Sequence, residues 1–121
     1  MAYIFSTGAV LRLLALRRDD PLVRWIEEER IRPFIALTTM ASVRHEILTT
    51  DRVSADQRSI LQKRCTALAR DLTNGNRQEV TAAIFDMKSA EILADILPID
   101  AGRDMLSDLD LVPAAIAIQH N

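Results

Sequence analysis

Apolar residues along the chain fall either in short continuous runs or at helical spacing. The runs, typical of short buried strands, are residues 2–5 (AYIF), 33–37 (PFIAL) and 79–85 (EVTAAIF). Between and after them, apolar residues recur every three or four positions, the period of a helix that buries one face. Short strands alternating with amphipathic helices predict a helix-rich α/β domain, with helices on both faces of a parallel sheet of about three strands.

Polar and helix-breaking residues mark the predicted helix ends. The predicted ends are Asp20 before Pro21, Thr38 or Thr39 after the second run, Ser54 with Gln57 as a capping box, Asn74-Gly75 as a stop, Asp86 after the third run, and Pro98 as a stop. Pro113 lies in the last apolar segment, where a helix interior tolerates proline poorly. We therefore expect the last helix to start at about Asp110, or to be kinked there.

Composition limits the possible functions. The 121 residues suit one domain spanning the whole chain, and 49% hydrophobic residues suffice for a core. A formal net charge of -2 requires any nucleic-acid binding to use a local basic patch, and 4% aromatic residues argue against a base-stacking surface. The one cysteine, Cys65, is expected to be a buried hydrophobe in a reducing compartment. Without a membrane-length apolar run or a secretion signal, we expect a soluble, cytoplasmic protein.

Ligand sites in parallel sheets lie beyond the carboxyl ends of the strands. The candidate residues at this edge are Ser6, Thr38 and Thr39, Ser42 in the next turn, Asp86, and Asp108 or Asp110 from the last helix. Ser6 follows the first run directly, but the stretch FSTGA lacks the Gly-x-Ser-x-Gly pattern of a hydrolase nucleophile. We therefore interpret Ser6 as a helix cap or turn residue rather than as a nucleophile. The two histidines, His45 and His120, do not make a zinc site.

Four stretches carry a resemblance to a known family. In chain order they are IFSTGAVLRLL, LTTMASVRHEIL, VTAAIFDMKSAEILADI and GRDMLSDLDLVPAAIAIQHN. Together they resemble the PIN domain, in particular the small toxin ribonucleases of VapC and FitB type, over nearly the whole chain. The resemblance implies a three-layer α/β/α fold. It also implies RNA cleavage by a Mg²⁺ or Mn²⁺ ion that acidic residues hold at the carboxyl edge of the sheet.

Carrying the acidic positions over leaves one carboxylate in place. The first falls on Ser6, where the family has Asp, and the second on Ser42, where the family has Glu. The third falls on Asp110, which matches. The family's fourth acid follows a further strand, and this sequence ends at Asn121 before it. Hard divalent cations need several oxygen ligands and negative charge, so we expect metal binding to be lost.

Two functions follow from this resemblance. The first is a PIN-like domain without ribonuclease activity or cofactor, kept as a binding or interaction module with a toxin–antitoxin partner. The alternative is an active Mg²⁺- or Mn²⁺-dependent endoribonuclease that uses Asp110 with displaced acids such as Glu46 and Asp108, and Asp86 is a further candidate. An unrelated helical interaction protein remains a third interpretation. RNA is a partner only of the active form.

Two surfaces of the predicted fold bear on partners. The arginines that could face RNA, which we interpret as solvated surface residues, are Arg12, Arg17, Arg18, Arg24, Arg44 and Arg103. Without the family's last strand, the run at residues 2–5 would have an unpaired edge, and the helix at residues 114–118 (AAIAI) would lack cover. We therefore predict that a second chain covers this surface, most simply in a homodimer.

Overall fold

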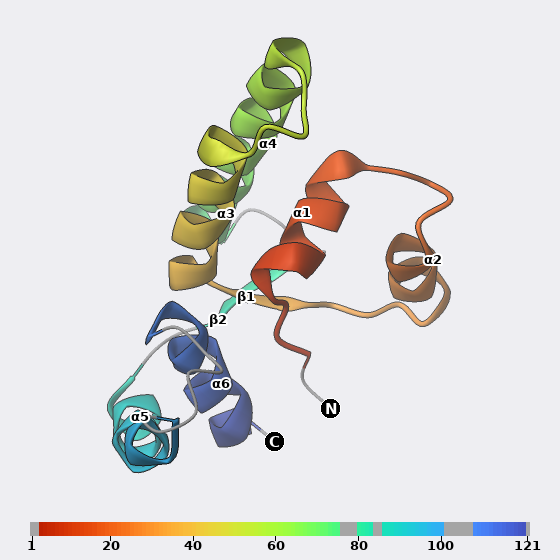
Figure 1. Ribbon diagram of the computed structural model, residues 1–121. Helices are drawn as coiled ribbons and strands as arrows, with labels where there is room; N and C mark the ends of the chain where they lie inside the picture. The colour runs from red at the N-terminus through yellow and green to blue at the C-terminus, as the bar shows by residue number, and fades with distance from the viewer. Residues whose placement is uncertain (1–2, 76–79, 84–85, 101–107, 121) are drawn as a thin grey trace.

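The computed structural model of the chain describes residues 3–75, 80–83, 86–100 and 108–120, with the backbone alone for 97–100 and 108–111. The elements in chain order are α1 (Thr7–Ala15), α2 (Pro21–Glu28), β1 (Phe34–Ala36), α3 (Leu37–Thr49), α4 (Ala55–Asn74), β2 (Thr81–Ala83), α5 (Met87–Asp100) and α6 (Asp108–His120). Helices α3 and α4 lie side by side, and α5 and α6 form a second pair (Figure 1). Among the described helices, none has both the length and the apolar character needed to span a bilayer.

The sheet is parallel and small, as expected, but among the described residues it contains two strands instead of three. β1 pairs with β2 in the register Ile35 opposite Ala82. The predicted first strand contributes one parallel bridge, between Ile4 and Phe34, with Phe5 N donating to Phe34 O at 3.0 Å. The chain turns into α1 at Thr7, immediately after this bridge, so the extended segment is too short to form a longer ladder.

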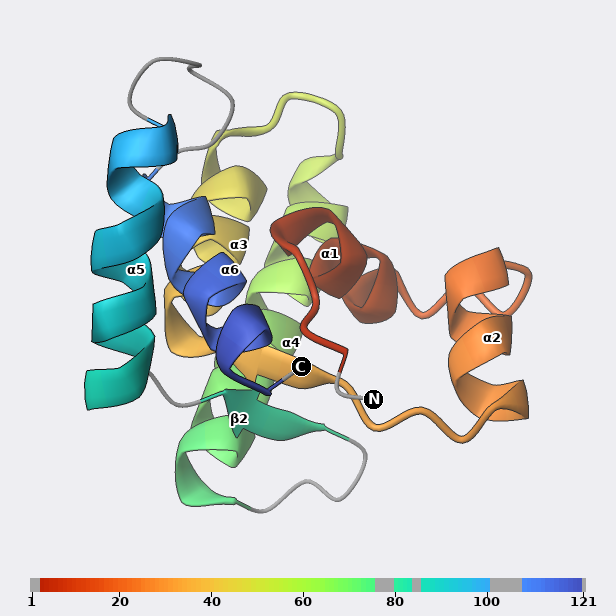
Figure 2. The same cartoon turned by 90° about the horizontal axis from the view of Figure 1, so that it is seen from below.

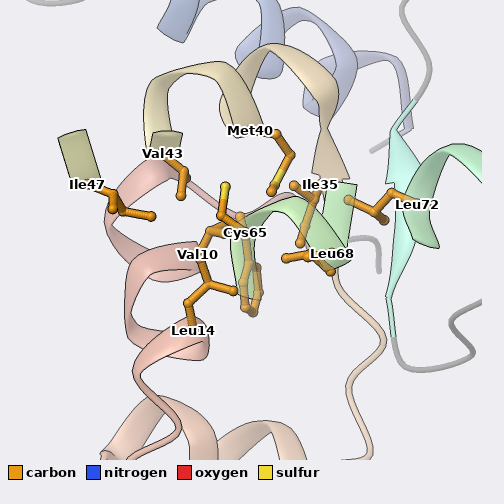
Figure 3. Packing of buried hydrophobic residues seen from close by; sticks show 10 residues of the cluster. Val10, Leu14, Ile35, Met40, Val43, Ile47, Cys65, Leu68 and Leu72 are labelled. Atoms are coloured by element: carbon orange, nitrogen blue, oxygen red, sulfur yellow. The ribbon is translucent and has the colours of Figure 1, made fainter. Parts of the chain in front are cut away.

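Side chains of β1 alternate between two clusters, one on each face of the sheet. Ile35 joins Phe5 in the larger cluster, against α1, α3 and α4. Ala36 packs with Ala83 and with Ile116 of α6 on the opposite face. Figure 3 shows the side chains of the larger cluster pointing toward one another: Val10, Leu14, Ile35, Met40, Val43, Ile47, Cys65, Leu68 and Leu72. The burial expected for Cys65 is confirmed. The pleat of one short strand thus connects both apolar clusters.

Three of the predicted helix ends outside the candidate site are confirmed by the contacts that define them. The Asp20 side chain accepts a hydrogen bond from Leu22 N at 2.8 Å, with Pro21 as the first helical residue. Ser54 and Gln57 form the reciprocal bonds of a capping box at 3.0 and 3.2 Å. Gly75 ends α4 with a φ of 67°, a left-handed conformation that glycine adopts without strain.

Three other predicted helix ends are wrong or displaced. α3 begins at Leu37 directly after β1, so Thr38 and Thr39 lie inside its first turn and make no cap. α5 continues through Pro98 to Asp100, and α6 begins two residues before Asp110 with Pro113 inside it. A proline removes one helical N–H and crowds one carbonyl, a local cost that the packing of α5 against α6 can offset.

The expectation that the segment AAIAI lacks cover is wrong. Ala115 and Ile116 are fully buried, and α6 packs against α5 and α3 of the same chain. Figure 2 shows α6 between α5 and the rest of the domain. Ile118, by contrast, remains 53% exposed. Cover for α6 therefore requires no second chain, and the prediction of a homodimer now depends on the outer edge of the first segment alone.

Replacement of Ile35 by alanine tests the central role of β1. Ile35 is fully buried, so Ile35→Ala is expected to lower the free energy of unfolding by about 2–5 kcal/mol through lost burial and a residual cavity. The matched control is Ile60→Ala on α4, where the side chain is 48% exposed and a cost within about 1 kcal/mol is expected. Urea unfolding followed by circular dichroism measures both. Equal losses in the two variants would contradict this description of the core.

Candidate functional site

The chain segments that carry Ser6, Ser42 and Asp110 meet at the carboxyl end of β1. Ser6 lies between the bridge segment and α1, and Ser42 lies in the second turn of α3, which starts directly after β1. Asp110 is the third residue of α6, and the side chains of Asp108 and Asp110 lie outside the described part of the chain. Three of the four predicted segments thus come together at this edge, and the segment of Asp86 does not line the hollow that they form.

A shallow hollow of about 280 Å³ lies where these segments meet. It is lined by Ile4, Phe5, Ser6, Thr7, Thr39, Pro113, Ala114 and Ala117. Pro113, Ala114 and Ala117 line the hollow from α6, in the turns that follow position 110 along the chain. The lining is mostly apolar, and its polar side chains carry hydroxyl groups.

The Ser6 hydroxyl caps α1, as the sequence predicts. Its backbone is extended, with φ −73° and ψ 168°, and its Oγ accepts a hydrogen bond from Ala9 N at 3.3 Å. The Ser6 carbonyl accepts the first helical bond from Val10 N at 3.0 Å. Ser6 Oγ thereby satisfies one of the backbone donors that a helix start leaves unpaired. The Ser6 side chain therefore has a structural role.

The hydroxyl of Ser42 bonds to its own helix. Ser42 is half-buried, and its Oγ donates to the carbonyl of Thr38 one turn earlier, at 3.5 Å. Thr39, which lines the hollow, is 3% exposed. Glu46, the proposed displaced acid, is exposed on α3 one turn beyond Ser42. The arrangement of Glu46 is that of a solvated surface residue.

A Mg²⁺ or Mn²⁺ ion does not fit the described donors at this edge. Such an ion requires oxygen ligands that include negative charge. The hollow offers the hydroxyls of Ser6, Thr7 and Thr39, which are neutral, and Ser6 already accepts a bond from the backbone. Within the described ranges, no three residues of the types His, Cys, Asp and Glu lie close enough to hold a metal ion.

Asp86 directly precedes α5 and caps it, as predicted. Its side chain also bonds to Gln119, a residue that the sequence analysis did not single out. Its Oδ1 accepts from Ser89 N at 3.0 Å, and Ser89 Oγ accepts from Asp86 N at 3.4 Å. Gln119 of α6 donates from Nε2 to Asp86 Oδ2 at 2.9 Å, and its Oε1 is hydrogen-bonded to Ser89 Oγ. Ser89 is fully buried. This cluster fastens the C-terminal end of α6 to the start of α5.

The acidity of Asp86 gives a pH test of this cluster. The Ser89 backbone N–H, followed by the Gln119 amide, lowers the pKa of Asp86 from its ordinary 3.8 to about 2. A carboxyl with a lowered folded-state pKa stabilises the fold above its unfolded pKa, and this contribution is lost as the pH falls from about 4 toward 2. Asp86→Asn should still cap the helix but cannot titrate.

We therefore expect the free energy of unfolding of the wild type to fall more steeply than that of Asp86→Asn between about pH 4 and 2. Urea unfolding at a series of pH values measures the difference. Parallel curves for the two proteins would show that the carboxylate does not stabilise the folded state.

Comparison with protein-family models, with curated protein sequences and with solved structures finds no match for this chain. The resemblance to the PIN family therefore rests on the four sequence motifs. The segments that carry Ser6, Ser42 and Asp110 do meet at one edge of a parallel sheet, which is compatible with that resemblance.

Proposed function

We propose that the chain is a PIN-like α/β/α domain that has lost metal-dependent ribonuclease activity and acts as a binding or interaction module. The observation that carries this proposal is the hydrogen bond from Ala9 N to Ser6 Oγ. The resemblance implies a metal-binding carboxylate at this position, and here a neutral hydroxyl caps α1 instead. The serine cap stabilises α1 without any metal ion. This supports the proposal that the fold was kept after the ion site was lost.

The loss of charge is the physical basis of the proposal. Serine in place of Asp and Glu, at Ser6 and Ser42, removes two negative charges from the proposed site and leaves Asp110 as the matching acid. Mg²⁺ gives up its water ligands reluctantly, and a hydroxyl adds no charge to offset that cost. An apolar hollow bordered by small residues such as Ala114 and Ala117 is better suited to a small apolar side chain than to a hydrated cation.

The expected partner is a protein, either a second copy of the chain or an antitoxin-like protein. The backbones of Tyr3 and Phe5 bond to Phe34 on the side that faces β1. Tyr3 is partly exposed, at 36%, and lies against Trp25 of α2. The opposite side of this segment, away from β1, is the outer edge of the sheet. The outer edge of a sheet can accept a strand from another chain, which supports the homodimer as a prediction.

Restoring the acids tests the proposal directly. Ser6→Asp keeps a good cap, and with Ser42→Glu it supplies the two missing carboxylates. We expect calorimetry to detect no Mn²⁺ binding at this edge in the wild type and to detect binding in the double variant, which implies an affinity at least about tenfold above the detection limit. Adding Asp110→Asn should remove the gain. The control Ser54→Asp makes the same change at the cap of α4 and should gain nothing.

Two outcomes would contradict the proposal. If the double variant is folded and gains no Mn²⁺ affinity, the three positions do not form a vestigial metal site. If the wild type cleaves a generic RNA in a metal-dependent reaction that Asp110→Ala abolishes, the chain is an active endoribonuclease. In that case the displaced acids, Glu46 first, would be the next residues to replace.

A further inference from the structure

A second hollow, of about 410 Å³, lies between α3 and α4. It is lined by Arg44 and Ile47 of α3 and by Ser59, Gln62, Lys63, Cys65, Thr66, Ala67 and Arg70 of α4. We call it the α3–α4 groove. The hollow at Ser6 is lined by Thr39 of α3, whereas the groove begins at Arg44, so the two share no lining residue.

The groove is a positive region on a chain whose net charge is negative. Its charged lining residues are Arg44, Lys63 and Arg70, and no carboxylate is among the lining residues. The whole chain has a formal charge of -2 and the three groove cations contribute +3, so the residues outside the groove together carry -5. These three side chains are exposed, and within the described part of the chain none of them forms an ion pair. Clustered unpaired cations attract and concentrate anions.

The cations are spaced along the groove rather than gathered at one point. Lys63 and Arg70 are seven residues apart on α4, which corresponds to about 10 Å along the helix axis. Thr66 lies between them on the same face, and Ser59 lies one turn before Lys63. Arg44 lines the groove from α3. An anion with several linked charged groups can contact all three cations at once without drawing their side chains together, which a single small anion would require.

We propose that the α3–α4 groove binds linked phosphate groups, those of a small polyphosphate or of a nucleic-acid backbone. Guanidinium and ammonium groups, backed by hydroxyl donors, match the many acceptor oxygens of such groups. The groove has no aromatic lining residue, so recognition is through phosphate and not through base stacking. An acidic peptide fits less well, because the apolar lining residues Ile47 and Cys65 are buried and offer no pocket for an anchoring side chain.

Binding of two probes to charge variants tests this proposal. The probes are inorganic tripolyphosphate, measured by calorimetry, and a labelled 12-nucleotide thymidine oligomer (about 11 phosphates), measured by fluorescence anisotropy at low salt. Lys63→Gln and Arg70→Gln should each weaken binding about tenfold. The matched controls are Lys88→Gln on α5 and Arg24→Gln on α2, which should change affinity less than about twofold. For the oligomer, each groove variant should also reduce the salt slope by about one.

The pattern of results decides the proposal and the source of the phosphates. Binding of tripolyphosphate, with the expected variant effects, supports a small polyphosphate ligand, and binding of the oligomer alone supports a nucleic-acid backbone. No binding of either probe, or equal effects in groove and control variants, would overturn the proposal. Equally tight binding of poly-glutamate would also overturn it, because the groove would then be a general anion site. The test leaves Ser6 and Ser42 unchanged, so its outcome is separate from that of the proposed function.

Discussion

Backbone hydrogen bonds on both sides of β1 hold the domain together. Phe34 N donates to Tyr3 O at 2.8 Å on one side, and Thr81 N donates to Pro33 O at 2.9 Å on the other. Because side chains alternate along a strand, Ile35 reaches the cluster with α1, α3 and α4, and its neighbour Ala36 reaches the cluster with α6. The same pairing fixes where α1 and α3 begin, and so it positions the edge at which Ser6 and Ser42 lie.

Local chemistry made much of this fold predictable. The caps at Asp20 and Ser54 and the stop at Gly75 depend on residues within a few positions of one another, and all three are confirmed. The cap at Ser6 was predicted for the same reason. Strand length was not predictable, because it depends on where the neighbouring segment turns. The predicted cap of α3 at Thr38 or Thr39 is wrong because β1 continues directly into α3 without a polar capping residue. Thr39 therefore lies inside the helix, where its side chain is buried.

Contacts between distant segments were beyond the sequence pattern. Gln119 contacts Asp86 across 33 positions, and the ring of His120 stacks on Phe34 with centroids 6.3 Å apart. These contacts hold the end of α6 against β1 and the start of α5. They explain why Ile116 is covered without a second chain. In the sequence, Gln119 is a polar residue at the end of an otherwise apolar helix. A residue exposed to solvent at that position would give the same pattern, so the pattern does not predict the contact with Asp86.

The two hollows differ in chemistry although α3 contributes to both. The hollow at Ser6 is mostly apolar and its polar side chains are neutral hydroxyls, whereas the α3–α4 groove carries Arg44, Lys63 and Arg70. In the proposed function the first hollow has lost its metal ion, and the phosphate binding that we propose for the second is independent of that loss. A domain with this arrangement would recognise its ligands through packing and charge rather than through metal chemistry.

The most direct measurement of the central claim is a nuclear magnetic resonance titration of the ¹⁵N-labelled wild-type protein with substoichiometric Mn²⁺. A bound paramagnetic ion broadens the amide signals nearest to it. With Ser6 committed to capping α1, we predict no selective broadening of the amides around the hollow, those of Ala9, Thr39 and Ala114. Selective broadening of these three signals at low Mn²⁺, removed by Asp110→Asn, would contradict the claim that the ion site has been lost.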